Sequence, residues 1–308
     1  VRGRYDEAHD LGDPSPSSSL LGRTLPSVTN CSGRTLGTEE AAAVTRVLES
    51  GMLSSVWGTE VRSLEHEMAE RFSVTHAVAC SSGTAAIHLA MAASAISPGD
   101  EVITTPISDF GSVAPILAQN AVPVFADVDP ATGNLDPVAV RRAIGPRTRA
   151  FLVVHLFGAP AQMEQLRRLA DGRNLTLIED CAQAWLTETD AHGTLAGVIG
   201  DVGCFSLQQW KHITCGDGGL VITSDDEKAS RMRLFADKGW PRETNERVHL
   251  SFGLNYRMTE LQGAVARAQL AKLDGVVSRR RQRAEQLLRR LASLPGLGLP
   301  DPAGHAWW

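Results

Sequence analysis

The chain has 308 residues, of which 43% are hydrophobic, and carries a formal net charge of −5. This length suits one large domain, or one domain with part of a second. The net negative charge does not favour binding to nucleic acid. No apolar run approaches the roughly 20 residues of a membrane span, so we expect no membrane partner. The five cysteines follow no metal-ligand spacing, which predicts reduced thiols, no metal site and a cytoplasmic location.

Residues 1–32 are rich in Ser, Pro, Gly and charge, and they predict a mobile arm or an interface strap. Thr38 is expected to cap a helix that ends at Gly51. A second helix is expected from about Thr59 to Phe72. These two helices precede the part of the chain in which strands begin.

From residue 77 onward, apolar strands alternate with helices. The expected strands are residues 77–80, 101–105, 122–127, 150–156, 175–180, 203–207 and 219–223. The expected helices are residues 83–94, 110–119, 137–144, 161–171 and 225–237. This alternation predicts an α/β fold with a mainly parallel seven-stranded sheet and helices on both faces. The amphipathic stretch 259–291 follows, and its basic run 279–283 is expected to be a solvated helix face.

A lysine lies in the polar turn after the strand 203–207. This residue, Lys211, precedes a group of glycines at residues 216–219 that opens the next strand. Between two buried strands, its amine could form a Schiff base with a carbonyl compound, because burial lowers the pKa of a lysine. The alternative is a solvated lysine in an ordinary turn.

Two other strand ends fit the same chemistry. Asp180 ends the apolar run 175–180, where open α/β sheets place ligand contacts, although it could instead cap the strand end. The small-residue turn 81–84 follows a strand and opens a helix, and a helix N-terminus is a ready site for a phosphate dianion. The chain thus offers a phosphate site, an acid and a lysine in that order.

In this arrangement the chain resembles the DegT/StrS family of pyridoxal-phosphate sugar aminotransferases, which have the aspartate-aminotransferase fold (fold type I). The resemblance spans roughly residues 33–275. The segments that carry it are SSGTAA (81–86), PVFADVD (123–129), VHLFG (154–158), EDCAQA (179–184), FSLQQWK (205–211), GDGG (216–219) and GLNYRMTEL (253–261). It implies a large cofactor-binding domain over residues 33–245, then a linking helix and an incomplete small C-terminal domain over residues 246–308.

The resemblance implies pyridoxal phosphate as the cofactor, with Lys211 and Asp180 as catalytic residues. Lys211 would hold the cofactor as a Schiff base and shuttle the proton, and lysine here favours amino transfer over dehydration. Asp180 would pair with the pyridine nitrogen. Gln183 would bond the ring oxygen O3′ unless it is solvated. The cofactor-binding residues implied are Ser82, Gly83, Thr84, Asp109, Phe110, Asp180, Gln183, Ser206, Lys211 and Asn255.

Three points stay open within the resemblance. Relatives stack an aromatic ring on the cofactor, but the aligned position here is Asp109, so Phe110 stacks only if the loop shifts by one residue. Asp109 could instead contact the substrate amine. Asn255 would reach the phosphate of a neighbouring subunit, which implies a homodimer, unless it is a turn residue or Arg257 takes that role. The connector 51–58 either approaches the substrate or only joins two helices.

The implied function is transfer of an amino group from glutamate or glutamine to a keto-sugar, a nucleotide-linked keto-sugar or a keto-cyclitol. Amino-sugar or aminocyclitol biosynthesis for an antibiotic or a surface glycan would use such a step. Relatives usually continue through a small C-terminal domain, whereas this chain stops at Trp308. The alternatives are cyclisation or elimination with the same cofactor, or a degenerate homologue that acts as a regulator or partner subunit.

Overall fold

The computed structural model describes residues 19–20, 23–24, 34–242, 244 and 248–308. The chain divides into two units, Val1–Leu36 and Gly37–Trp308. In the first unit, β1 (Ser19–Leu20) and β2 (Arg23–Thr24) pair antiparallel. Most of the predicted arm lies outside the described residues, and so does the predicted domain boundary at residues 245–246, so both stay predictions.

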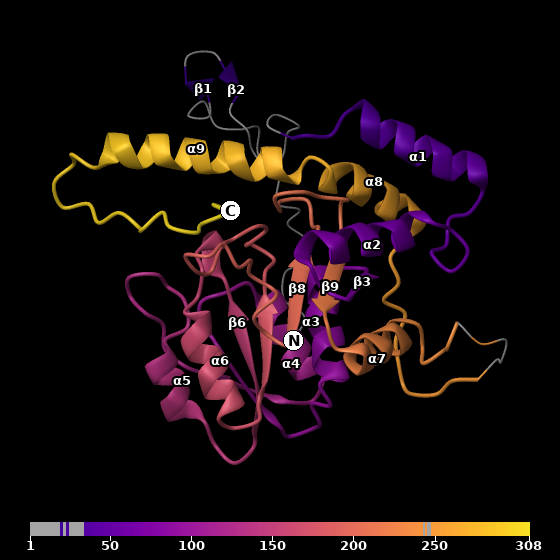
Figure 1. Ribbon diagram of the computed structural model, residues 1–308, viewed down its shortest axis with the longest axis horizontal. Helices are drawn as coiled ribbons and strands as arrows, with labels where there is room; N and C mark the ends of the chain where they lie inside the picture. The colour runs from indigo at the N-terminus through magenta and orange to yellow at the C-terminus, as the bar shows by residue number, and fades with distance from the viewer. Residues whose placement is uncertain (1–18, 21–22, 25–33, 243, 245–247) are drawn as a thin grey trace, which may run out of the picture. The chain divides into compact units, whose positions relative to one another are not determined.

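A seven-stranded sheet forms the centre of the second unit (Figure 1). Its strands are β3 (His76–Cys80), β4 (Glu101–Thr104), β5 (Val122–Phe125), β6 (Thr148–Val154), β7 (Thr176–Asp180), β8 (Val202–Ser206) and β9 (Gly219–Thr223). They lie in the order β3-β9-β8-β7-β6-β4-β5. β9 pairs antiparallel with β3 and with β8, and the other neighbouring strands pair parallel, so the predicted mainly parallel α/β fold is confirmed.

The helices of this unit lie close to their predicted positions. They are α1 (Thr38–Ser50), α2 (Glu60–Phe72), α3 (Gly83–Ala93), α4 (Phe110–Ala118), α5 (Pro137–Ala143), α6 (Met163–Asp171), α7 (Asp226–Ala236), α8 (Glu260–Leu270) and α9 (Leu273–Leu291). The cap of α1 is Gly37, not Thr38, and the Gly37 N–H donates to Glu40 Oε2 at 2.7 Å. Among the described helices, none is both long and apolar enough to cross a membrane.

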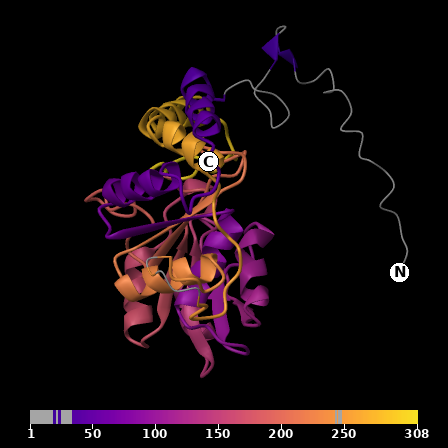
Figure 2. The same ribbon diagram turned by 90° about the vertical axis from the view of Figure 1, so that its right-hand side faces the viewer.

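Alternating side chains of each strand supply the two faces of the sheet, because successive residues of a strand point to opposite sides. On one face, Ala79, Phe205 and Leu220 pack in a core with residues of α2. On the other, Cys80, Cys204 and other buried residues pack with α3 and α7. Figure 2 shows the two layers of helices on either side of the sheet. Neighbouring residues at a strand end therefore serve different faces.

The stretch 259–291 forms two helices with a break between Leu270 and Leu273. Lys272, in the break, holds Glu40 of α1 through an ion pair of 2.8 Å between Nζ and Oε1. The basic run in α9 is only partly a solvated face. Arg281 donates to the backbone carbonyls of His305 at 3.0 Å and Leu186 at 2.7 Å. These bonds tie the last residues of the chain to the body of the unit.

Candidate active site

Asp180 is buried at the carboxyl end of β7. Its Oδ2 accepts a hydrogen bond from Ser112 Oγ at 2.7 Å, and its Oδ1 accepts one from the Ala182 N–H at 3.0 Å. Burial raises the pKa of Asp180, while these two donors and the nearby charge of Lys211 oppose the rise. The carboxylate is thus fixed in orientation by a donor on each oxygen.

Lys211 lies in the turn after β8, as the sequence predicts. Its backbone N–H donates to Gln208 O at 2.9 Å, and its side chain is half-buried. The Nζ lies 4.8 Å from the centroid of the Trp308 ring. Burial lowers the pKa of Lys211, whereas the charges of Asp180 and Asp109 raise it. An amine with a lowered pKa is neutral more often and reacts more readily with a carbonyl carbon.

The small-residue turn opens α3. Ser82 is the N-cap, and its Oγ accepts from the Ala85 N–H at 3.0 Å. Gly83 is the first helical residue, and a Cβ built on it would lie 2.7 Å from the Ser206 Cβ at the end of β8. Thr84 follows in the same turn. The structure therefore brings the free N–H groups of the helix start and the Ser206 side chain together, although the two are far apart in sequence.

Gln183 is buried beyond the end of β7. Its Oε1 accepts from the Phe157 N–H at 2.6 Å, so the amide oxygen is already in use. Because the amide oxygen faces the Phe157 N–H, the Nε2 donor group of Gln183 points away from Phe157. Phe157 has a positive φ of 54°, which an L-residue rarely adopts, and its ring stacks with Trp308 at a centroid distance of 6.1 Å. Gln183 is therefore a buried side chain and not the solvated glutamine of the alternative interpretation.

Asp109 and Phe110 begin α4. Asp109 is the N-cap, and its Oδ1 accepts from the Gly111 N–H at 2.7 Å. A Cβ built on Gly111 would lie 2.8 Å from this oxygen and 2.9 Å from Thr84 Oγ1, which places Asp109 beside the start of α3. Phe110 is 66% exposed. The charge of Asp109 reaches Lys211 and raises the pKa of its amine.

Asn255 contacts a different part of the chain from the residues described above. It is exposed and forms an isolated antiparallel bridge with Asp237. Arg257 forms an ion pair with the same Asp237, whose carboxylate also accepts from Arg242. Arg257 is therefore engaged within its own chain, whereas the side chain of Asn255 is exposed.

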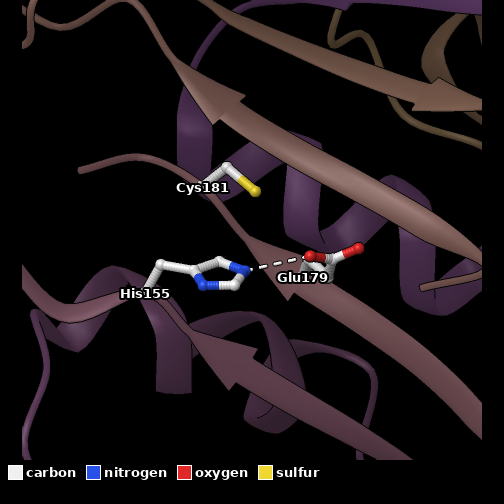
Figure 3. Close-up of side chains that lie close together, drawn as sticks. All are labelled: His155, Glu179 and Cys181. Atoms are coloured by element: carbon white, nitrogen blue, oxygen red, sulfur yellow. Dashed lines mark hydrogen bonds and ion pairs between the residues drawn. The ribbon is translucent and has the colours of Figure 1, made fainter. Parts of the chain in front are cut away.

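Figure 3 shows a second buried group of side chains at the same sheet edge, His155, Glu179 and Cys181. His155 Nε2 lies 2.9 Å from Glu179 Oε2, and His155 Nδ1 accepts from the Ala161 N–H at 3.1 Å. The backbone N–H groups of Gly197, Ile199 and Gly200 donate to the same carboxylate.

Both ring nitrogens of His155 and both oxygens of Glu179 are thus already engaged. The contact with Ala161 assigns the proton of the neutral ring to Nε2, which donates to Glu179. Glu179 points to the face of the sheet opposite Asp180, as expected of adjacent residues in a strand. We assign the group to holding the loop 197–200 beside β7.

The gathered residues fit one kind of cofactor. A helix start and a serine hydroxyl suit a phosphate group, the buried carboxylate of Asp180 suits a protonated ring nitrogen, and Lys211 offers an amine for a carbonyl carbon. Residues 34–308 match the sequence profile of the DegT/DnrJ/EryC1/StrS aminotransferase family. The chain belongs to this family. It is an aminotransferase, and its cofactor is pyridoxal phosphate.

Two curated relatives of this DegT-family aminotransferase come from Streptomyces. The dTDP-3-amino-3,4,6-trideoxy-alpha-D-glucose transaminase of Streptomyces venezuelae is 40% identical over 277 residues, which cover 88% of this chain and 71% of the relative. The L-glutamine:2-deoxy-scyllo-inosose aminotransferase of Streptomyces kanamyceticus is 41% identical over 263 residues, which cover 80% of this chain and 60% of the relative.

A solved structure shares the fold and contains a cofactor. NtdA from Bacillus subtilis, with the cofactor PMP bound, superposes with a TM-score of 0.82 at 28% identity. The match covers 92% of this chain and 65% of that chain. The resemblance inferred from the motifs is therefore confirmed at the level of family, fold and cofactor.

Sequence reasoning missed three residues of this aminotransferase that the structure adds to the site. Ser112 contacts Asp180, Phe157 contacts Gln183, and Trp308 covers Lys211. Phe157 stands inside a recognised motif, but its backbone role leaves no mark on the sequence. Ser112 lies in the first turn of α4 and Ser108 precedes its N-cap Asp109, so helical spacing does not relate the two serines and no local pattern points to them.

Proposed function

We propose that this aminotransferase moves an amino group from glutamate or glutamine to the keto group of a sugar, a nucleotide-linked sugar or a cyclitol. One observation carries the proposal: Lys211, whose pKa is lowered by burial, lies within electrostatic reach of the buried carboxylate of Asp180. The names of the Streptomyces relatives support the acceptor class, and one of them supports L-glutamine as donor. The product would be a building block of amino sugars or aminocyclitols, including those of antibiotics.

Pyridoxal phosphate, when bound, supplies an electron sink for the carbanion left when a substrate loses its α-proton. Lys211 would hold its carbonyl carbon through the side-chain amine, and Asp180 would accept a hydrogen bond from its ring nitrogen. Gln183 would donate to its ring oxygen, since its own amide oxygen is bonded to Phe157. The residues that would bind its phosphate are Ser82, Gly83, Thr84 and Ser206.

Lys211 is also the base of the proposed reaction. Once the amino group of the substrate has displaced it from the carbonyl carbon, the freed Nζ would accept the α-proton of the substrate and return a proton to the carbon that needs one, which is efficient when the amine is neutral near the working pH. Burial favours that neutral form. The Trp308 ring, which stacks on Phe157 at an interplanar angle of 10°, lies beside Nζ and presents an apolar surface to it.

A homodimer with shared sites is part of the proposal. Asn255 is exposed, and the segment that leads to it carries Leu250 and Phe252, which are 61% and 77% exposed. Exposed apolar side chains next to an outward-facing polar residue favour an interface with a second copy. In that arrangement Asn255 donates to the cofactor phosphate of the partner subunit. Asp109 would then face the amino group of the substrate from within its own chain.

The test follows the absorption of the purified protein with pyridoxal phosphate before and after addition of glutamate or glutamine. The amino donor should bleach the visible band of the wild type. Lys211→Ala should form no stable band, and Lys228→Ala, at a lysine of α7 that pairs with Asp225, should behave as the wild type. Mass spectrometry with a dTDP-linked keto-sugar and with 2-deoxy-scyllo-inosose should then identify the aminated product.

Each alternative gives a different result. A band that forms but does not respond to either amino donor would favour cyclisation, elimination or a degenerate homologue, and would contradict amino transfer. Sedimentation should detect a dimer. Mixing the inactive Lys211→Ala and Asn255→Ala proteins should restore activity, because one site of each mixed dimer is intact. A fully active monomer would refute shared sites.

A further inference from the structure

A buried chain of hydroxyl groups lies behind Asp180. Ser112 Oγ is 2.7 Å from Asp180 Oδ2, and Ser108 Oγ is 2.7 Å from Ser112 Oγ. Ser112 is 2% exposed and Asp180 is 5% exposed, while Ser108 is half-buried. The three oxygens connect the loop after β4 to the carboxyl end of β7. No motif of the sequence analysis includes either serine.

The direction of these hydrogen bonds follows from the chemistry of the end group. An ionised carboxylate only accepts hydrogen bonds, so Ser112 donates to Asp180. Its single proton is then used, and Ser108 must donate to the Ser112 oxygen. Hydrogen bonds that follow one another in this way strengthen each other, and bonds to a charged acceptor are the strong ones.

A backbone hydrogen bond fixes the position from which Ser112 donates to Asp180. The Ser112 N–H donates to Asp109 O at 3.1 Å in the first turn of α4, so the hydroxyl is set by the start of the helix. The other carboxylate oxygen is held by the Ala182 N–H. With one donor on each oxygen, the plane of the Asp180 carboxylate is fixed and lone pairs remain for one more partner.

We propose that Ser112, supported by Ser108, is a positioning residue that keeps the Asp180 carboxylate ionised and oriented toward the ring nitrogen of the cofactor. The inference rests on the proposed function, because it concerns the same bound group. Without the hydroxyl, a buried carboxylate loses a donor and takes up a proton more readily. A protonated Asp180 is a poorer acceptor for a protonated ring nitrogen.

The test measures the dissociation constants of pyridoxal phosphate and of its 1-deaza analogue, in which a C–H replaces the ring nitrogen. Ser112→Ala should weaken binding of pyridoxal phosphate about tenfold. It should change binding of the 1-deaza analogue much less, since that analogue offers Asp180 no N–H. Any covalent bond to Lys211 is common to both compounds and cancels in the comparison.

Three further variants complete the design. Ser112→Thr keeps the hydroxyl and should bind pyridoxal phosphate much more tightly than Ser112→Ala does. Ser108→Ala should weaken binding of pyridoxal phosphate less than Ser112→Ala does. Ser94→Ala is the control, because it removes a hydroxyl that bonds only the backbone carbonyl of Ala90 at 2.7 Å. If Ser112→Ala proves unstable, Ser108→Ala and Ser112→Thr carry the comparison of the two compounds.

The outcomes separate this inference from the proposed function. Equal weakening of both compounds by Ser112→Ala would mean a general structural role and would overturn the inference, as would no weakening at all. Selective weakening of pyridoxal phosphate, rescued by threonine, would support it. A wild type that binds neither compound would refute the proposed function itself, and the inference with it.

Discussion

Gly83 and Ser206 approach so closely that a Cβ on the glycine would lie 2.7 Å from the Ser206 Cβ and 3.3 Å from its Cα. The contact joins the start of α3 to the end of β8. It brings the N–H groups of a helix start to a serine hydroxyl without a side chain between them. The phosphate end of the proposed cofactor site depends on this absence of a side chain.

Gly83→Ala should therefore weaken the binding of pyridoxal phosphate and destabilise the protein. Overpacking of this kind costs about 1–3 kcal/mol, because Ser206 and its backbone have to shift. Titration with the cofactor and thermal unfolding measure the two effects. Gly298→Ala is the control, since a Cβ there meets nothing within 4 Å. Unchanged affinity in Gly83→Ala would argue that the phosphate binds elsewhere.

Asp180→Asn should stabilise the cofactor-free protein while it abolishes amino transfer. Burial raises the pKa of Asp180 in the folded state, so the folded protein binds more protons than the unfolded chain between the two pKa values. The contribution of Asp180 to the free energy of unfolding therefore falls as pH rises from its unfolded-state pKa through its folded-state pKa, because the buried carboxyl group becomes ionised. The variant should melt about 2–4 °C higher at pH 8, with a smaller difference at pH 4. A lower melting temperature at pH 8 would contradict this account.

Asp109→Asn should make Lys211 react with pyridoxal phosphate at lower pH. The charge of Asp109 raises the pKa of Lys211, so its removal lowers that pKa and increases the neutral fraction below it. Stopped-flow measurements should show a roughly twofold faster capture at neutral pH, a modest effect because Asp109 is exposed.

Asp136→Asn is the matched control, because it also caps a helix, α5, through its side chain. Asparagine preserves capping at both positions, so the comparison isolates the charge. The expected result is a pH–rate profile displaced to lower pH for Asp109→Asn alone. Coincident profiles for the wild type and both variants would show that Asp109 does not act on the lysine.

Glu179→Gln should destabilise the protein without a direct effect on the cofactor chemistry. The side-chain NH₂ group would meet N–H donors of the loop 197–200 or of His155, at a cost of about 3 kcal/mol. The melting temperature should fall by about 6–12 °C. Glu164→Gln, at a largely exposed carboxylate on α6, should change little. A chelator should not alter the wild-type melting curve, and a marked drop would identify a metal site instead.

Much of the site could be predicted because it follows strand ends. The positions of Asp180 and Lys211 depend only on where apolar runs stop, and α/β sheets place ligands at that edge. The turn Ser82–Thr84 is recognisable by its small residues before a helix. The helix break at Lys272 and the N-cap at Gly37 are harder to predict from the sequence, because helix ends depend on contacts with other elements.

The sequence by itself determined the alternation of strands and helices, the family and the cofactor, because these depend on local periodicity and on motifs within short segments. Tertiary structure decided which side chains meet. Ser112 and Asp180 are 68 residues apart, and Glu60 and Glu260 are 200 residues apart. Such contacts depend on how helices pack on the sheet, which no local pattern specifies. Packing also directs Glu179 to the loop 197–200 and Asp180 to Ser112, although the two acids are neighbours in the chain.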